Sequence, residues 1–200
     1  MNQITPIPAT GEKITVLSPL GRPPEVRRKV PAPRLESLDG KTIYLVDARF
    51  DDSIELLKQV QAWFTDHMPR VTTKLVSMSA YYGKDDPTTW KEIQEHGHAA
   101  IIGVGHCSTC APAVSTHAVT LESQYRIPTV ALHTDKFDKV VRSVTRVAGL
   151  PEVACVFVPQ PVMGKTAEEL RAYVDGLDPH TGKKVMQEVV EALTAEMSRV

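Results

Sequence analysis

The segment Ala99-Ala-Ile-Ile-Gly-Val-Gly105 places the strongest constraint on the fold of this chain, because every one of its residues is apolar. A strand that faces water on one side alternates apolar and polar residues, whereas a strand covered on both faces is apolar throughout. Parallel sheets with helices on both faces contain strands of the second kind. The segment therefore predicts a central strand of such a sheet.

The residues around this segment alternate between strand and helix patterns. The predicted strands are 41–47, 71–78, 99–105, 127–133 and 153–158. The predicted helices are 53–64, 87–96, 111–124 and 136–148, followed by a capping box at Thr166-x-x-Glu169 and a closing helix over 183–197. This order predicts an α/β fold with a single doubly wound, mostly parallel sheet, flavodoxin-like or related.

The first 40 residues differ from the rest in their high proline content. Proline at this density prevents long helices and favours extended backbone. We therefore predict an extended N-terminal arm over 1–40 and an α/β domain with C-terminal helices over 41–200. The arm also carries a basic cluster, which could bind an anionic substrate, but we expect a solvated arm or one that wraps a second copy in a homo-oligomer. The prolines are Pro6, Pro8, Pro19, Pro23, Pro24, Pro31 and Pro33.

The charge and composition of the chain argue against several classes of binding partner. The 200 residues include 23 Lys and Arg against 24 Asp and Glu, a net charge of −1, so no strong field attracts nucleic acid or an anionic membrane. No run approaches the roughly 20 apolar residues that span a bilayer, and the first residues lack the pattern of a signal peptide. We expect a cytoplasmic protein with a small-molecule substrate and with neither nucleic acid nor membrane as a partner.

Three cysteines, two of them close together, indicate chemical use rather than a disulfide framework. Cys107-Ser108-Thr109-Cys110 directly follows the segment 99–105, and ligands bind at the carboxyl ends of strands in open parallel sheets. A helix N-terminus can lower a cysteine pKa from about 8.5 toward about 7. We predict that Cys107 is the nucleophile and that Cys110 captures the resulting intermediate as a disulfide.

Several polar residues are predicted to end strands at the same edge. His133 ends the next strand and is the predicted acid, base or thiolate partner. Asp47, His106, Ser108 and Thr109 are the predicted substrate contacts, although Asp47 could instead cap a loop and His106 could point away. Other candidates receive structural interpretations: Cys155 as core packing, Glu122 as a surface charge, and His96, His98 and His180 as exposed imidazoles.

A metal site is the alternative reading of the pair. Cys107 and Cys110 could bind copper or zinc together with His106, and His117 or His133 could complete the site. A closed zinc site usually needs four ligands, and no second cysteine pair occurs. Dinucleotide-binding, phosphate-loop and serine-hydrolase motifs do not occur either, so no cofactor is certain.

Short motifs along much of the chain resemble the UGSC family. They are Ala32-Pro-Arg-Leu35, Leu38-x-Gly-Lys-Thr-Ile43, Gly105-x-Cys-x-x-Cys110, Ile127-Pro-Thr-Val130 and Val158-Pro-x-Pro161. The family includes selenoproteins and takes its name from a selenocysteine-Gly-Ser-Cys motif. The second half also resembles the selenocysteine subunit of the glycine, sarcosine and betaine reductases. The resemblance implies that Cys107 matches the selenocysteine, whereas Ser108 and Thr109 replace Gly and Ser.

These observations favour a thiol-dependent oxidoreductase or lyase. Its dithiol would attack a small electrophilic substrate and cleave a C–N, C–S or similar bond reductively, and a thiol reductant would then reset the pair. The copper or zinc protein remains the rival hypothesis. A cysteine-dependent racemase or lyase ranks last, because such enzymes need opposed cysteines from two halves of the protein.

Overall fold

The computed structural model of this protein describes residues 25–81 and 83–194. They form one five-stranded sheet in the order β2-β1-β3-β4-β5, and every pair of neighbouring strands is parallel. This confirms the predicted α/β fold. The strands are β1 Thr42–Asp47, β2 Thr72–Ser77, β3 Ala99–Gly105, β4 Thr129–Thr134 and β5 Ala154–Val158.

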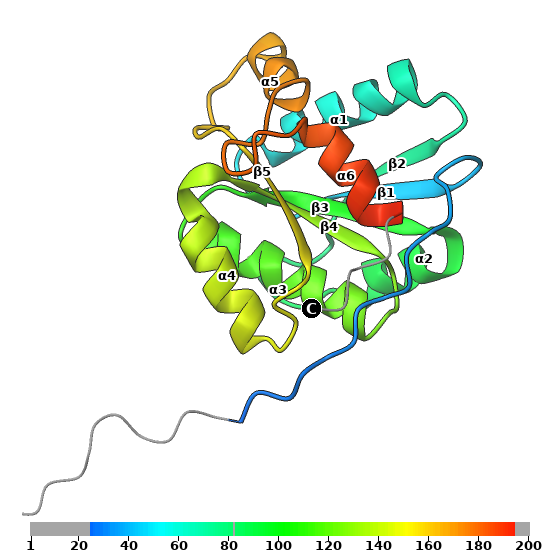
Figure 1. Cartoon of the computed structure of the whole chain (residues 1–200), viewed down its shortest axis with the longest axis vertical. Coiled ribbons are helices and arrows are strands. Elements are labelled where there is room, and N and C mark those ends of the chain that lie inside the picture. Colours follow the sequence, from blue (N-terminus) through cyan, green and yellow to red (C-terminus); the bar gives the residue numbers. More distant parts are fainter. Residues whose placement is uncertain (1–24, 82, 195–200) are drawn as a thin grey trace, which may run out of the picture.

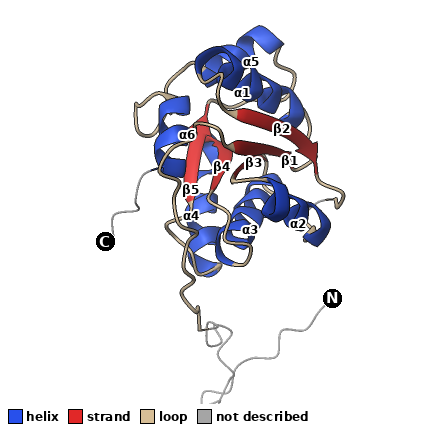
Figure 2. Cartoon of the chain, turned by 90° about the vertical axis from the view of Figure 1, so that its right-hand side faces the viewer, coloured by secondary structure: helices blue, strands red, loops and turns tan. Residues whose placement is uncertain are grey.

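Helices cover both faces of the sheet (Figures 1 and 2). They are α1 Ser53–His67, α2 Pro87–His96, α3 Cys110–Ser123, α4 Asp138–Val147, α5 Ala167–Val174 and α6 Val185–Thr194. Helices α1, α5 and α6 lie on one face, and α2, α3 and α4 lie on the other. A 3-10 turn at Asp135–Phe137 precedes α4, and both bonds of the capping box at Thr166 are present. The predicted end of the closing helix at 197 lies outside the described residues.

Strand β3 is the central strand, as its apolar sequence predicts. All of its residues are buried. Ile101 and Val104 pack in the core on the α1 face, whereas Ala100 and Ile102 pack in the core on the α3 face. The strand ends irregularly: its register against β4 shifts between Ile102 and Gly105, and the Gly103–Val104 peptide bond is cis.

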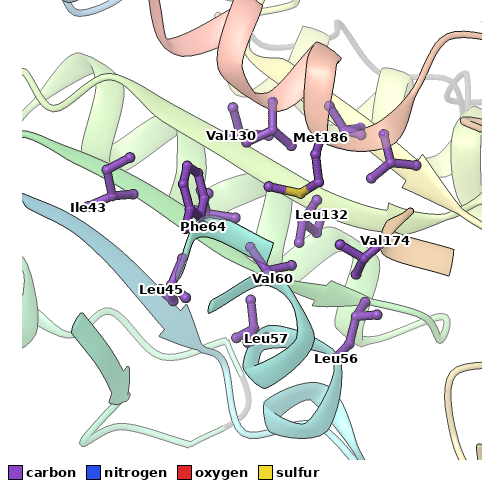
Figure 3. Close-up of a cluster of buried hydrophobic side chains, with 14 of the residues drawn as sticks. Ile43, Leu45, Leu56, Leu57, Val60, Phe64, Val130, Leu132, Val174 and Met186 are labelled. Carbon is purple, nitrogen blue, oxygen red and sulfur yellow. The ribbon is translucent and has the colours of Figure 1, made fainter. Parts of the chain in front are cut away.

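The larger core lies between the sheet and helices α1, α5 and α6 (Figure 3). Leu56, Leu57, Val60 and Phe64 recur on one side of α1 at helical spacing and are almost completely buried. Leu132 of β4 packs in the same cluster. The opposite face of the sheet carries α3, whose first residue is Cys110 (Figure 1).

The described part of the predicted arm, residues 25–40, packs on the chain's own domain. Arg34 and Glu122 form an ion pair in which Nη1 lies 2.7 Å from Oε1 and both side chains are buried. The prediction of Glu122 as a surface charge was therefore wrong. The Leu35 N–H donates to the Leu193 carbonyl at 3.0 Å. Residues 1–24 lie outside the described residues. Because residues 25–40 pack on the domain, a truncation that tests whether the arm wraps a second copy should remove only residues 1–24.

In the described part of the chain, no helix combines the length and apolar character needed to cross a membrane.

Candidate functional site

Cys107 and Cys110 occupy the turn between β3 and α3, at the carboxyl end of the sheet, and are joined by a disulfide. Cys110 is the first residue of α3 and is only 2% exposed, whereas Cys107 is half-buried. Ser108 and Thr109, between them, are exposed. The predicted nucleophile is thus the more exposed of the two cysteines, and its predicted partner is buried at the start of the helix.

The first turn of α3 provides donors to Cys107. The Cys110 N–H donates to Sγ of Cys107 at 3.0 Å, and the Ala111 N–H donates to the Cys107 carbonyl at 3.0 Å. Backbone donors at a helix N-terminus favour negative charge on a neighbouring atom. The start of α3 thus directs one backbone donor at the Cys107 sulfur and one at its carbonyl.

One side of the dithiol is apolar. Cys110 packs in the same cluster as Ala48 and Phe50, which follow β1, and Met78, which follows β2; Cys107 packs against this cluster. The loop after β2 also reaches α3, because a Cβ added at Gly83 would lie 3.3 Å from that of Ala113. The apolar cluster that contains Cys110 therefore includes residues from the loops after β1 and β2.

Asp47 lies at the predicted edge, but its carboxylate oxygens already have partners. Oδ1 accepts from the Arg49 N–H and Oδ2 from the Ser77 hydroxyl, each at 2.8 Å. Asp47 is also buried, at 5% exposed. These contacts hold the ends of β1 and β2 together, which matches the loop-capping interpretation better than substrate contact.

Asp86 organises the neighbouring loop, a role that the sequence analysis missed. Burial raises the pKa of Asp86, but hydrogen bonds from Ser79 and Thr89 outweigh this effect and lower the pKa to about 2. The Ser79 hydroxyl donates at 2.7 Å, and the Thr89 hydroxyl donates at 2.7 Å. The only local signal was an aspartate immediately before Pro87, a pattern typical of a helix start.

His133 lies in the strand next to the dithiol but deep inside the core. Its imidazole is completely buried beside Gly105, with Nε2 3.4 Å from the Ser115 hydroxyl and the ring 5.9 Å from that of Phe157. Burial lowers the pKa of His133 to about 3, against a smaller opposing effect of the Gly105 backbone. His133 is therefore neutral near pH 7, and a catalytic role for it stays a prediction.

His106 lies immediately before Cys107 and is 7% exposed. Burial lowers its pKa, and the nearby Asp51 and Asp52 carboxylates partly oppose that effect. Nε2 of His106 is buried and has no hydrogen-bond partner among the described residues. The imidazole is thus a neutral group with an unused nitrogen close to the dithiol turn.

Gln160, in the loop after β5, joins three strand ends. Its backbone N–H donates to Oδ1 of Asp135 at 3.0 Å, and its Nε2 donates to the His106 carbonyl at 3.3 Å. Further along the same loop, the Gly164 N–H donates to Oδ2 of Asp52 at 2.7 Å. The loops after β1, β3, β4 and β5 therefore meet at one edge. Gln160 was not predicted to be a site residue, although in the resemblance to the UGSC family it stands where relatives often carry a histidine between two prolines.

A family model described as the UGSC family matches residues 15–195. The chain belongs to the UGSC family. The matched range contains all five strands and both cysteines of the disulfide. No curated protein matches the chain.

The described residues of this UGSC protein do not assemble the alternative metal site. Within 25–81 and 83–194, no group of three or more His, Cys, Asp or Glu side chains is arranged to hold a metal ion. His117, one possible extra ligand, is buried on α3 with its ring 5.5 Å from that of Trp90. The geometry therefore gives no support to a site of Cys107, Cys110 and His106.

The remaining cysteine and histidines of the UGSC protein match their structural interpretations. Cys155 is a free cysteine in β5, and burial raises the pKa of its thiol to about 12. At neutral pH this thiol is protonated and a poor nucleophile. His96, His98 and His180 are exposed. Cys155 therefore packs as a structural residue, and the cysteines of the turn after β3 are Cys107 and Cys110.

Proposed function

We propose that this protein is a thiol-dependent enzyme that reductively cleaves a bond in a small electrophilic substrate. The observation that carries the proposal is the pairing of a half-buried Cys107 with a buried Cys110 at the N-terminus of α3. A partly accessible thiolate with a second thiol behind it is the arrangement that nucleophilic attack followed by disulfide formation requires.

The reaction has two steps. The Cys107 thiolate displaces a leaving group X⁻ from a substrate R–X, which forms a thioether between Cys107 and R. The Cys110 thiolate then attacks the Cys107 sulfur, so that an S–S bond forms, the S–R bond breaks, and R leaves with the electron pair and takes up a proton. The dithiol is oxidised to the disulfide, and R–X is reduced to R–H.

The second step limits the substrate. R must be able to hold the electron pair from the broken S–R bond, and a carbonyl group next to the reacting carbon does this by forming an enolate. Two equivalents of an external thiol then reduce the disulfide and return the enzyme to its dithiol form. We propose that the external reductant is a cytoplasmic thiol, because the cytoplasm contains a pool of reductants that keeps protein thiols reduced.

The probe that tests the proposal is phenacyl bromide, an α-bromo ketone. Reduced protein should release acetophenone and form the Cys107–Cys110 disulfide in equal amounts. The Cys110→Ser variant should stop after the first step and keep a phenacyl thioether on Cys107, visible by mass spectrometry. The Cys107→Ser variant should form neither the disulfide nor a phenacyl thioether at position 107.

Cys155→Ser provides the matched control, because this cysteine lies in β5, outside the dithiol turn, and burial keeps its thiol protonated. This variant should leave acetophenone release unchanged. Undiminished acetophenone release by Cys107→Ser would refute the assignment of the nucleophile. Rapid release by Cys110→Ser without added thiol would refute the role of Cys110.

A further inference from the structure

The larger hydrophobic core opens to the surface in a cavity of about 630 Å³, where the C-terminal ends of α1 and α5 meet α6. We call it the helix-end cavity. Val174 of α5 and Met186 of α6 line this cavity and belong to the core (Figure 3). Trp63, Met68 and Val190 also line it and pack against the core while partly buried. A cavity of this size with a mainly apolar lining is typical of a site for a small organic ligand.

One wall of the helix-end cavity is aromatic. The rings of Trp63 and His67, one turn apart on α1, are stacked with their centroids 4.6 Å apart and their planes inclined by 13°. Nδ1 of His67 lies 3.0 Å from the Trp63 carbonyl, which holds the imidazole beside the indole. Met68 and Met186 add thioether groups, which make favourable contacts with aromatic rings. Because aromatic rings also pair favourably with one another, an aromatic ring is the apolar group that suits this lining best.

The carboxylates at the rim of the helix-end cavity already have cationic partners. Asp175 pairs with Arg171 at 2.8 Å, and Arg171 also pairs with Asp66 at 3.0 Å. Glu191 pairs with Lys183 at 3.3 Å. The negative charges of the rim are therefore balanced from within the chain.

Lys184 is a further cation of the lining, and its charge is also accommodated. Its ammonium donates to the Asp175 carbonyl at 2.8 Å, at the negative end of the α5 dipole. Apart from His67, the charged residues of the lining and their ion-pair partners are three carboxylates and three cations. A charged ligand would leave water for a site with no net charge opposite to its own, which costs free energy. The rim therefore favours an uncharged ligand.

The helix-end cavity lies away from the dithiol turn. At the start of α1, the Ser53 hydroxyl accepts from the Val104 N–H at 3.0 Å, close to the end of β3. Trp63 follows ten residues later on α1, a separation of about 15 Å along an α-helix. The cavity is thus near the other end of this helix, and its ligand need not be the substrate of the dithiol.

We propose that the helix-end cavity binds a small uncharged aromatic compound, with its ring in contact with Trp63 and with the thioethers of Met68 and Met186. Val174 and Val190 supply the rest of the apolar contact, and a polar group of the ligand lies at the rim among the paired charges. This is a second binding site of the protein, and it does not depend on the proposed thiol chemistry.

Three probes of similar shape and different charge test the inference. At pH 7, 2-naphthol is uncharged, 2-naphthoate is an anion and 2-naphthylmethylamine is a cation. Equilibrium dialysis measures the affinity and stoichiometry of each probe. We expect one 2-naphthol to bind per chain, about 5-fold or more tightly than either charged probe, because burying a charge without a counter-charge is unfavourable. Absence of 2-naphthol binding, or a charged probe that binds as tightly as 2-naphthol, would overturn the inference.

The two tryptophans of the chain locate the bound probe. Trp63 lines the cavity and is half-buried, whereas Trp90 of α2 is completely buried on the other face of the sheet (Figures 1 and 2). When 2-naphthol binds, the indole N–H signal of Trp63 should shift in a ¹H–¹⁵N NMR spectrum, and that of Trp90 should not. An unchanged Trp63 signal with 2-naphthol bound would place the probe elsewhere and would refute the proposal.

A substitution inside the cavity provides an independent test. Val190→Asp places a carboxylate in the apolar lining and should weaken 2-naphthol binding by about 10-fold. Val147→Asp is the matched control, because it makes the same change at an exposed position of α4 and should bind as wild type. Equal binding by the two variants would contradict the proposal. If Val190→Asp does not fold, as judged by circular dichroism, the Trp63 signal of the wild type decides.

The Cys107→Ser variant separates the helix-end cavity from the dithiol turn. It should bind 2-naphthol with the affinity of the wild type, because the cavity is lined by other elements. Loss of 2-naphthol binding in this variant would show that the probe occupies the dithiol turn instead.

Discussion

Gly105 and His133 show how closely the backbone and side chains fit next to the dithiol. A Cβ added at Gly105 would overlap the His133 ring, coming within 2.7 Å of Cε1, and would lie 2.9 Å from the Ala111 Cα. Atoms do not approach so closely without displacement. Glycine at this position therefore lets a whole imidazole pack between β3 and the start of α3, where it fills the core below the reactive turn.

The buried His133 should make stability depend on pH. Because its pKa falls from about 6.5 to about 3 on folding, the folded protein binds fewer protons than the unfolded chain between these values. Stability is therefore lost as pH falls through this window. The free energy of unfolding, measured with urea, should fall between pH 7.5 and 5.0 in wild type. We expect this fall to be smaller in His133→Gln by about 2 kcal/mol.

Burial also lowers the pKa values of His106 and His117, which adds to the loss of stability at low pH. This contribution is the same in wild type and in His133→Gln, so the difference between them isolates His133. An identical loss in wild type and His133→Gln would show that this imidazole is not held neutral by the fold.

The strands and helices follow from local sequence because local physics determines them. The apolar run at 99–105 predicts a strand covered on both faces, and the capping box at Thr166 predicts the start of α5. Boundaries differ by a few residues where tertiary contacts decide, as at the 3-10 turn Asp135–Phe137 before α4. The position of the dithiol at the carboxyl edge also follows, because it depends only on the direction of β3.

The polar contacts of the site could not be predicted in this way. Gln160 and His106 are 54 positions apart, and Glu122 and Arg34 are 88 apart. No periodicity links such pairs, since they meet only when separate loops converge. A polar residue near the end of a helix is usually exposed, which is why Glu122 was misread, and its burial depends on a partner from the N-terminal segment.

At the scale of the whole molecule, Glu122 fastens the N-terminal segment to the sheet. Its two oxygens accept from the backbone N–H groups of Ala32 and Thr129 as well as from Arg34, each at 2.7 Å. One carboxylate thus joins the chain before β1, the start of β4 and the end of α3. The segment 25–40 is part of the folded domain through these contacts.

Removing this charge should destabilise the whole domain. In Glu122→Gln the buried Arg34 guanidinium loses its counter-charge, so we expect the free energy of unfolding in urea to fall by about 3–5 kcal/mol. Glu152→Gln is the matched control, because it removes the partner of the exposed Arg28 and should cost about 1 kcal/mol or less. Equal effects in the two variants would mean that the Arg34–Glu122 pair contributes no more than a surface contact.

The most direct test of the central claim is a thiol titration of the purified, reduced protein, read by mass spectrometry with and without added zinc. With oxidised glutathione and no zinc, we expect Cys107 and Cys110 to lose two hydrogens as a pair and to recover them on addition of dithiothreitol. We expect the same result when zinc is present. Cys155 should remain a free thiol throughout. The claim is contradicted if Cys107 and Cys110 stay unlinked in the oxidant, or if zinc binds the protein in equal amount and protects both thiols.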